Sequence, residues 1–202
     1  MCTNLGVSVE LEPDDVELEP LRNSKFVYIE GYLWDGEQPR AASRHAMAAA
    51  KEHDVPVAFT FSDMFLVDRF GDDFRKLTEE FCDVVFCNAE EIRHFFKLES
   101  IEACAAELGK IVKTAFITDG PNGCYVIHEG QAEHVPGFEA KAIDTVGAGD
   151  AFAGGVLFGL THELGLNEAA RWGNYVASRV VQVQGARLEE SIIDQVDKVL
   201  GR

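Results

Sequence analysis

The chain has 202 residues, of which 47% are hydrophobic, and its 35 acidic and 18 basic residues give a formal net charge of −17. That length supports one sizeable core, and no linker composition divides it, so we expect a single domain over residues 1–202. The negative charge disfavours nucleic acids and anionic membranes as partners, because their phosphates would be repelled and no Lys/Arg cluster concentrates positive charge.

The first 120 residues alternate between apolar runs and helical patterns. The runs are rich in Val, Ile, Phe and Tyr, and their near-continuous apolar character is typical of parallel strands covered on both faces. This alternation predicts an α/β sheet. The expected strands are residues 25–33, 55–61, 83–88 and 114–120, and the expected helices are residues 40–53, 72–81, 89–96 and 101–112.

The pattern changes after residue 120. Residues 123–137 read as two short strands joined at Glu129 and Gly130, which predicts an antiparallel hairpin. Helices are then expected at residues 148–162, 167–183 and 189–200, and the Gly155–Gly159 spacing predicts close helix packing inside the core. The predicted fold is therefore a three-layer α/β fold, with a mostly parallel sheet flanked by helices and one antiparallel hairpin.

The cysteines and the chain start bear on the compartment. The five cysteines are odd in number and lack CxxC spacing, which predicts reduced thiols in a cytoplasmic protein, with Cys82 and Cys87 packed in the core rather than binding zinc. The first residues turn acidic before any long apolar run, so we expect no signal peptide. The longest apolar run, near residues 156–160, is far shorter than the roughly 20 residues of a bilayer span.

Three polar or glycine-bearing stretches follow predicted strands: residues 87–91, 118–123 and 144–150. Ligands of open α/β sheets bind at the carboxyl ends of the strands, so we expect these stretches to surround one cleft. Among known motifs, the sequence contains neither GxxxxGK[ST] nor GxSxG, and Phe152 replaces the third glycine of a dinucleotide fingerprint.

The stretch DTVGAGD (144–150) predicts an anion site. Small residues entering a helix leave the N–H groups of Gly147, Ala148 and Gly149 free to point at one spot, and the positive end of the helix reinforces them. Asp150 would then lie beside the anion, where it could accept a proton from an attacking hydroxyl. Equally, Asp150 could simply interact favourably with the helix dipole, and the glycines could serve no purpose other than tight packing. Spacing alone does not separate these readings.

The longer segment DTVGAGDAFAGGVLFGL (144–160) resembles the second signature of the ribokinase-like, or PfkB, carbohydrate kinases, a family that includes adenosine kinases. In the same order along the chain, NAEE (88–91) is similar to the NxxE motif of that family and TDGPNG (118–123) to its nucleotide-binding TxGxxG segment. Residues 172–188 resemble its adenine-side helix and terminal loop, and YIEGYLW (28–34) resembles the nucleoside-kinase branches. The resemblance covers effectively the whole chain.

The resemblance implies an ATP-dependent phosphotransferase acting on a hydroxymethyl group of a sugar or nucleoside. Asp150 would deprotonate that hydroxymethyl group, and Gly147 to Gly149 would stabilise the transferring γ-phosphoryl group. Asn88 and Glu91 would organise Mg²⁺ through water, because hard oxygen ligands suit magnesium. Taken alone, NAEE would more simply be a solvated helix start with Asn88 as the N-cap.

The resemblance also implies further nucleotide and cation contacts. Asn174 would lie along the adenine, or else be a surface amide of its helix. Asp144, with the loop at Gly185, would hold a monovalent cation such as potassium, or else stabilise a turn. The TxGxxG residues are Thr118, Gly120 and Gly123. They would border the nucleotide, or else form an ordinary strand-to-hairpin turn.

One departure from the family pattern concerns the start of the chain. Relatives begin with a segment that bears a glycine-pair signature, a substrate-gripping aspartate and a small β-lid, and this chain resembles them from just past that segment. We therefore expect a nucleotide-binding, C-terminal portion that is inactive or weak, with an exposed sheet edge. The alternatives are a non-catalytic fragment that binds nucleotide or a partner and, distantly, a dinucleotide-dependent oxidoreductase. The acceptor sugar or nucleoside is not selected, and a homodimer is possible.

Overall fold

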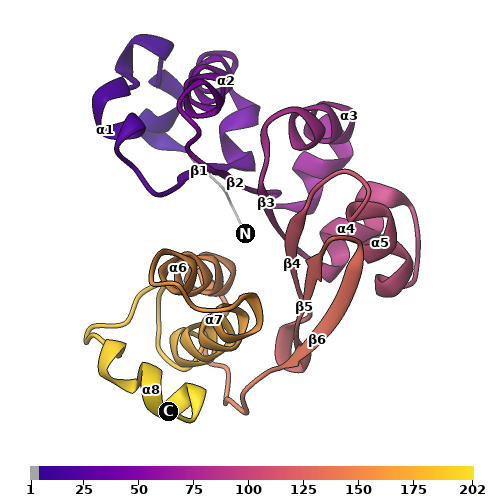
Figure 1. Cartoon of the computed structure of the whole chain (residues 1–202), viewed down its shortest axis with the longest axis vertical. Coiled ribbons are helices and arrows are strands. Elements are labelled where there is room, and N and C mark those ends of the chain that lie inside the picture. The colour runs from indigo at the N-terminus through magenta and orange to yellow at the C-terminus, as the bar shows by residue number, and fades with distance from the viewer. Residues whose placement is uncertain (1–4) are drawn as a thin grey trace.

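The computed structural model describes residues 5–202 (Figure 1). One six-stranded sheet runs in the order β1-β2-β3-β4-β5-β6. The first four strands are parallel, and β5 and β6 pair antiparallel to their neighbours, which confirms the predicted fold class. The strands are β1 Val27–Glu30, β2 Val57–Thr60, β3 Val84–Asn88, β4 Thr114–Thr118, β5 Gly123–His128 and β6 Gln131–Pro136.

Helices cover both faces of this sheet. The parallel strands follow one another in chain order, and right-handed crossovers then place every connecting helix on the same face. Helices α2 to α5 lie there, whereas α6 and α7 lie on the opposite face (Figure 1). The α-helices are α1 Leu18–Arg22, α2 Glu37–Glu52, α3 Met64–Phe81, α4 Ala89–Phe96, α5 Ile101–Leu108, α6 Ala148–Thr161, α7 Leu166–Val180 and α8 Val196–Leu200. No helix among these residues is long and apolar enough to cross a membrane.

The two-residue period of the strands divides the core into two clusters. Along β3, Val85 and Cys87 join the cluster under α2 to α5. Val84 and Phe86 join the second cluster, under α6 and α7. A strand buried on both faces has no polar side, and this explains the near-continuous apolar runs in the sequence.

The predicted hairpin is confirmed at its turn. Glu129 has φ 49° and Gly130 has φ 78°, and two successive positive φ angles are the geometry of the type I′ turn that joins twisted strands. The close helix packing predicted at Gly155 and Gly159 is also confirmed. A Cβ atom on Gly155 would lie 2.8 Å from the Cα atom of Gly173 in α7, and one on Gly159 would lie 2.8 Å from the Cβ atom of Ala169.

Two helix predictions need correction. Helix α3 begins at Met64 rather than near residue 72, because the Asp63 side chain accepts a hydrogen bond from the Phe65 N–H at 3.1 Å and caps it. The last helix does not begin at residue 189. A 3₁₀-helix over Ile193–Gln195 leads into α8, because the exposed Glu189, Glu190 and Ser191 offer no apolar face to bury.

The cysteines within residues 5–202 are free thiols, as expected. Cys87, Cys104 and Cys124 are buried and Cys82 is half-buried. Burial raises the pKa of the Cys124 thiol to about 12, so this side chain stays protonated and packs as a small apolar group. Cys2 lies outside the described residues.

Candidate active site

The carboxyl ends of β3 and β4 bring two of the predicted stretches together. Asn88 and Thr118 are direct partners across the two strands. Helix α6 begins near the same ends, because the Phe152 ring packs against Phe86 of β3 at 6.4 Å and against Phe116 of β4 at 6.3 Å between centroids. Residues 88–91, 118–123 and 147–150 therefore lie at the carboxyl end of the central strands.

The glycines before α6 differ in their surroundings. Gly147 is the N-cap residue with φ 77°, and a Cβ atom there would lie 2.5 Å from the Cβ atom of Ala186. Gly149 is exposed, and a Cβ atom on it would meet nothing within 4 Å. Gly147 therefore allows the tight turn before α6, whereas Gly149 leaves the N-terminal end of the helix accessible.

One of the three expected N–H donors is engaged. The Ala148 N–H donates to the Thr145 carbonyl at 3.2 Å, which corrects the prediction that all three groups are free. For the N–H groups of Gly147 and Gly149, no protein acceptor is found within the described residues. These two donors, at the positive end of a 14-residue helix, can bind an anion.

Asp150 lies in the first turn of α6 with an exposed side chain. Burial raises the pKa of Glu30, and the charge of Asp150 raises it further. Burial also raises the pKa of Tyr32 to about 12, with contributions from the charges of Asp63, Asp150 and Glu91. The charges of Asp63 at the N-cap of α3, Glu91 of α4 and Asp150 of α6 therefore all act on Tyr32.

Asn88 and Glu91 form a reciprocal capping box at the start of α4. The Asn88 Oδ1 atom accepts from the Glu91 N–H at 2.9 Å, and Glu91 Oε2 and Oε1 accept from the Asn88 backbone N–H at 2.9 Å and Nδ2 at 2.7 Å. The N-cap reading of Asn88 is confirmed. Glu91 is not solvated, however: it is 4% exposed, and burial raises its pKa to about 7, with nearby Asp63 adding to the rise.

The TxGxxG segment forms a tight turn between β4 and β5. Gly123 has φ 103°, and a Cβ atom there would lie 2.2 Å from the Val135 carbonyl oxygen, so only glycine fits. Gly120 also has a positive φ, 53°, but with open surroundings. The Thr118 hydroxyl donates to the Cys87 carbonyl at 3.5 Å. This geometry supports the interpretation of the segment as a strand-to-hairpin turn. Its contacts with a nucleotide remain a prediction.

The structure uses Asn174 and Asp144 internally. Asn174 is buried rather than on the surface, and its Nδ2 atom donates to the Val135 and Pro136 carbonyls at 3.1 and 3.2 Å. Asp144 accepts backbone N–H bonds from Val146 at 3.0 Å and Gly185 at 3.1 Å, which lower its pKa. Asp144 therefore stabilises the turn, and the cation contact remains a prediction.

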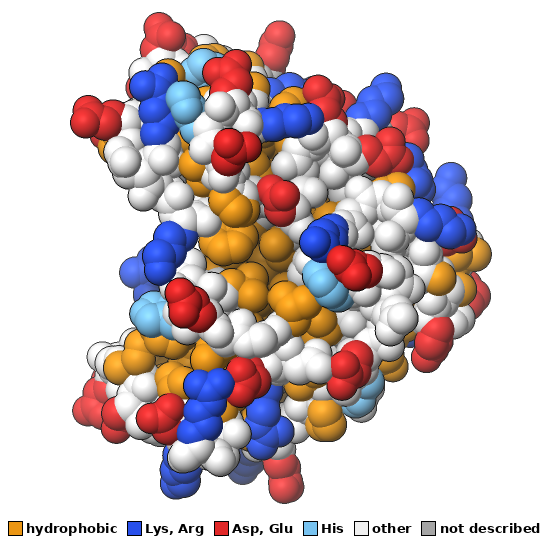
Figure 2. Space-filling model, in the orientation of Figure 1, with side chains coloured by type: hydrophobic (Ala, Val, Ile, Leu, Met, Phe, Trp, Pro, Cys, Tyr) orange, Lys and Arg blue, Asp and Glu red, His pale blue; other side chains and the backbone are white. Residues whose placement is uncertain are grey.

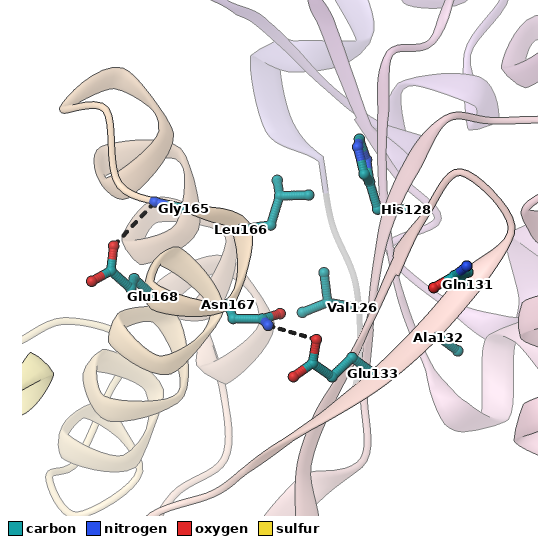
Figure 3. A pocket seen from close by; sticks show the side chains of 9 residues that line it. All are labelled: Val126, His128, Gln131, Ala132, Glu133, Gly165, Leu166, Asn167 and Glu168. Atoms are coloured by element: carbon teal, nitrogen blue, oxygen red, sulfur yellow. Dashed lines mark hydrogen bonds between the residues drawn. The ribbon is translucent and has the colours of Figure 1, made fainter.

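One cavity lies away from the candidate site. It measures about 650 Å³ and lies between the β5–β6 hairpin and the start of α7 (Figure 3). It is lined by His128, the partner of Thr114 at the amino end of β4, whereas the candidate site lies at the carboxyl end. None of the predicted site residues lines this cavity. Within the candidate site, Gly149 and Asp150 are exposed and Glu91 is buried.

Sequence reasoning missed the residues that β1 and α3 contribute. Glu30 ends β1, Tyr32 follows it, and the Tyr32 hydroxyl lies 3.5 Å from the Asp63 carboxylate. The available signal was that Asp63 follows a predicted strand and that Glu30 is an acidic residue in the second half of one, near the strand ends where ligands gather. Within residues 5–202, no three His, Cys, Asp or Glu side chains form a group that could hold a metal by themselves.

Comparison with known proteins decides the family. The family model for pfkB family carbohydrate kinases matches residues 1–192. The chain belongs to the pfkB family. Adenosine kinase 1 of Arabidopsis thaliana is 28% identical over 187 residues, covering 84% of this chain and 53% of the relative.

Solved pfkB structures extend the comparison. Adenosine kinase from Sinorhizobium meliloti superposes with a TM-score of 0.90 at 33% identity, covering 94% of this chain and 59% of that one. Aminoimidazole riboside kinase from Salmonella enterica, solved with its riboside and an ATP analogue, shares the fold with a TM-score of 0.79 at 21% identity, covering 94% and 66%. The chain thus spans a little over half the length of the adenosine kinases it matches.

Proposed function

We propose that this pfkB chain carries the phosphoryl-transfer site of an ATP-dependent kinase that phosphorylates a hydroxymethyl group of a sugar or nucleoside. One observation carries the proposal: Asp150 is exposed on the first turn of α6, beside the N–H groups of Gly147 and Gly149 that have no protein acceptor. A base and an anion site are thereby held within one helical turn. Transfer to an alcohol requires both of these elements.

In this proposal each residue has one task. The Asp150 carboxylate accepts the proton of the attacking hydroxyl. The N–H groups of Gly147 and Gly149 donate to oxygens of the transferring phosphoryl group, where negative charge develops. The packing of Phe152 against Phe86 and Phe116 fixes α6 over the strand ends, so that the base and the donors keep their relative positions.

The charge of the site supports a divalent cation. The charge of Asp150 acts on Glu30, and those of Asp150 and Glu91 act on Tyr32, so acidic groups would repel a triphosphate bound near Asp150. Bound Mg²⁺ would supply the compensating positive charge. Asn88 and Glu91 would hold it through water, because Glu91 already accepts from Asn88 with both oxygens and retains lone pairs only for additional donors.

Within this proposal, the residues that would contact the phosphate-accepting substrate favour a nucleoside. Met64 and Phe65 are 38% and 41% exposed, and they directly follow Asp63, which contacts Tyr32. Exposed apolar and aromatic side chains beside a polar cluster suit a ligand with a flat base and a hydroxylated sugar. Glu30 would accept a hydrogen bond from a sugar hydroxyl. The similarity to adenosine kinases is consistent with this choice.

We expect the 202-residue chain to transfer phosphate weakly when it is alone. Asp150 and Gly149 are exposed, so the site excludes little water. The test is titration calorimetry with ATP and Mg²⁺, followed by a phosphoryl-transfer assay with adenosine and with ribose. Binding without transfer would favour the alternative of a non-catalytic nucleotide-binding fragment, and the absence of both would refute the proposal. The oxidoreductase reading finds no support in the family match.

A further inference from the structure

Ser62 adopts a rare backbone conformation just after β2. Its φ angle is 68°, and the Asp63 N–H donates to the Phe61 carbonyl at 2.8 Å across it. This positive φ angle and this hydrogen bond between residues two positions apart are those of the classic γ-turn, which is rare and strained. Serine has no special tolerance for positive φ, so surrounding contacts must hold the conformation.

The other non-glycine residues with positive φ within residues 5–202 have ordinary roles. Glu129 lies in the hairpin turn, and Lys97 is the C-cap residue of α4. Asp54 and Glu163 directly follow the C-cap residues of α2 and α6. Left-handed residues are common at such turns and helix ends. Ser62 instead follows the carboxyl end of a strand, where ligands of α/β sheets bind and where backbone strain points to function.

The Ser62 side chain joins the end of β1 to the end of β2. The Gly31 N–H donates to Ser62 Oγ at 2.9 Å, and the Ser62 hydroxyl donates to the Thr60 carbonyl at 3.4 Å. Gly31 lies so close that a Cβ atom on it would be 2.6 Å from the Phe61 carbonyl oxygen. Glycine at position 62 would adopt the positive φ angle without strain but would offer no hydroxyl. The strain therefore accompanies the placement of this hydroxyl between two strand ends.

The joined segments carry groups assigned above to the phosphate-accepting substrate. Glu30 directly precedes the glycine that donates to Ser62, and Asp63 directly follows Ser62. The Tyr32 hydroxyl donates to the Asp63 carboxylate at 3.5 Å. Asp63 also caps α3 by accepting from the N–H of the exposed Phe65 at 3.1 Å. The γ-turn thus fixes the end of β1 relative to the start of α3.

Surface charge gives little orientation to a neutral substrate. Figure 2 shows acidic and basic side chains interspersed over one face of the molecule. A nucleoside or sugar carries no charge for these groups to attract. Such a substrate must be oriented by hydrogen-bonding and apolar groups whose own positions are fixed.

We propose that Ser62 is a positioning residue for the phosphate-accepting substrate. Its hydroxyl holds the Gly31 N–H and thereby fixes the Glu30 carboxylate relative to the start of α3, so that the sugar and the base of one nucleoside meet both at once. Ser62 acts through these neighbours and does not itself contact the substrate. This inference rests on the proposed kinase function.

Two substitutions separate the hydroxyl from the strain. Ser62→Gly removes both, whereas Ser62→Ala removes the hydroxyl and keeps the strain, so Ser62→Gly should have the higher Tm by about 2 °C or more. Both variants should bind adenosine about 2- to 10-fold more weakly than the unmodified chain, the range expected for one neutral hydrogen bond. Their affinity for ATP with Mg²⁺ should be unchanged. NMR chemical-shift titration measures the adenosine affinity, and calorimetry measures the ATP affinity.

The matched control is Asp54→Gly. The exposed Asp54 has φ 55° and lies before the amino end of β2, so this variant also relieves a positive φ angle but should leave both affinities unchanged. The inference is overturned if Ser62→Gly binds adenosine as tightly as this control, because glycine would replace a merely structural residue at this φ angle without loss. Absence of adenosine binding by the unmodified chain would instead refute the substrate side of the proposed function, and this inference with it.

Discussion

Two adjacent glycines of α6 provide a stringent test of the packing that positions the site. Gly155→Ala places a methyl group 2.8 Å from the Gly173 Cα atom and 3.2 Å from Val176 Cγ2, so α6 and α7 must move apart. Overpacking of this kind costs about 1–3 kcal/mol. Gly154→Ala makes the same chemical change one residue earlier, where the new methyl group meets nothing within 4 Å.

Both variants gain about 1 kcal/mol from the higher helix propensity of alanine, so their difference isolates the packing cost. We expect Gly154→Ala to stabilise the chain by about 1 kcal/mol and Gly155→Ala to be less stable than Gly154→Ala by about 1–3 kcal/mol. At about 2–4 °C for each kcal/mol, their melting temperatures should differ by about 2–12 °C. Thermal unfolding followed by far-UV circular dichroism measures this difference. Equal melting temperatures would show that the helices do not touch at residue 155.

Four other changes probe the site. Gly149→Val should abolish calorimetric binding of ATP with Mg²⁺, because a branched side chain would fill the open approach; undiminished binding would move the anion site elsewhere. In a full-length version, Asp150→Asn should retain ATP affinity but lower the transfer rate by about 10² to 10⁴, since an amide cannot accept the proton, and an unchanged rate would remove Asp150 from the mechanism. The pKa of Glu91 is raised in the folded chain from 4.5 to about 7, so the folded state holds this proton more tightly. Its stabilising contribution is full below pH 4.5 and is lost as the pH rises to 7, by at most roughly 3 kcal/mol. Urea unfolding of Glu91→Gln, which cannot ionise and keeps one of the two oxygens that accept from Asn88, should lack that decline; parallel pH curves would contradict it. Asn174→Asp should destabilise the chain by about 1–3 kcal/mol, because a carboxylate would face two carbonyl oxygens, and unchanged denaturation would contradict the observed bonds.

The sequence alone predicted the features that depend on neighbouring residues. The apolar runs predicted the four parallel strands, since a strand covered on both faces has no polar side. Glu129 and Gly130 predicted the hairpin turn. The spacing of Gly155 and Gly159 predicted close helix packing, because a missing side chain is useful where two backbones meet. The local order of motifs also identified the family that the comparison then established.

Only the tertiary structure decided which distant groups share one environment. Glu30 and Tyr32 lie more than a hundred residues from Asp150 in sequence, yet its charge raises both pKa values. Glu91 looked like a solvated helix start, but the chain packed around it buries the carboxylate. Burial and Coulomb interactions depend on the three-dimensional separation of groups, whereas strands, turns and caps depend on residues a few positions apart. The local pattern of this sequence therefore determined its elements, and the packing of α6 over the strand ends determined the chemical character of its site.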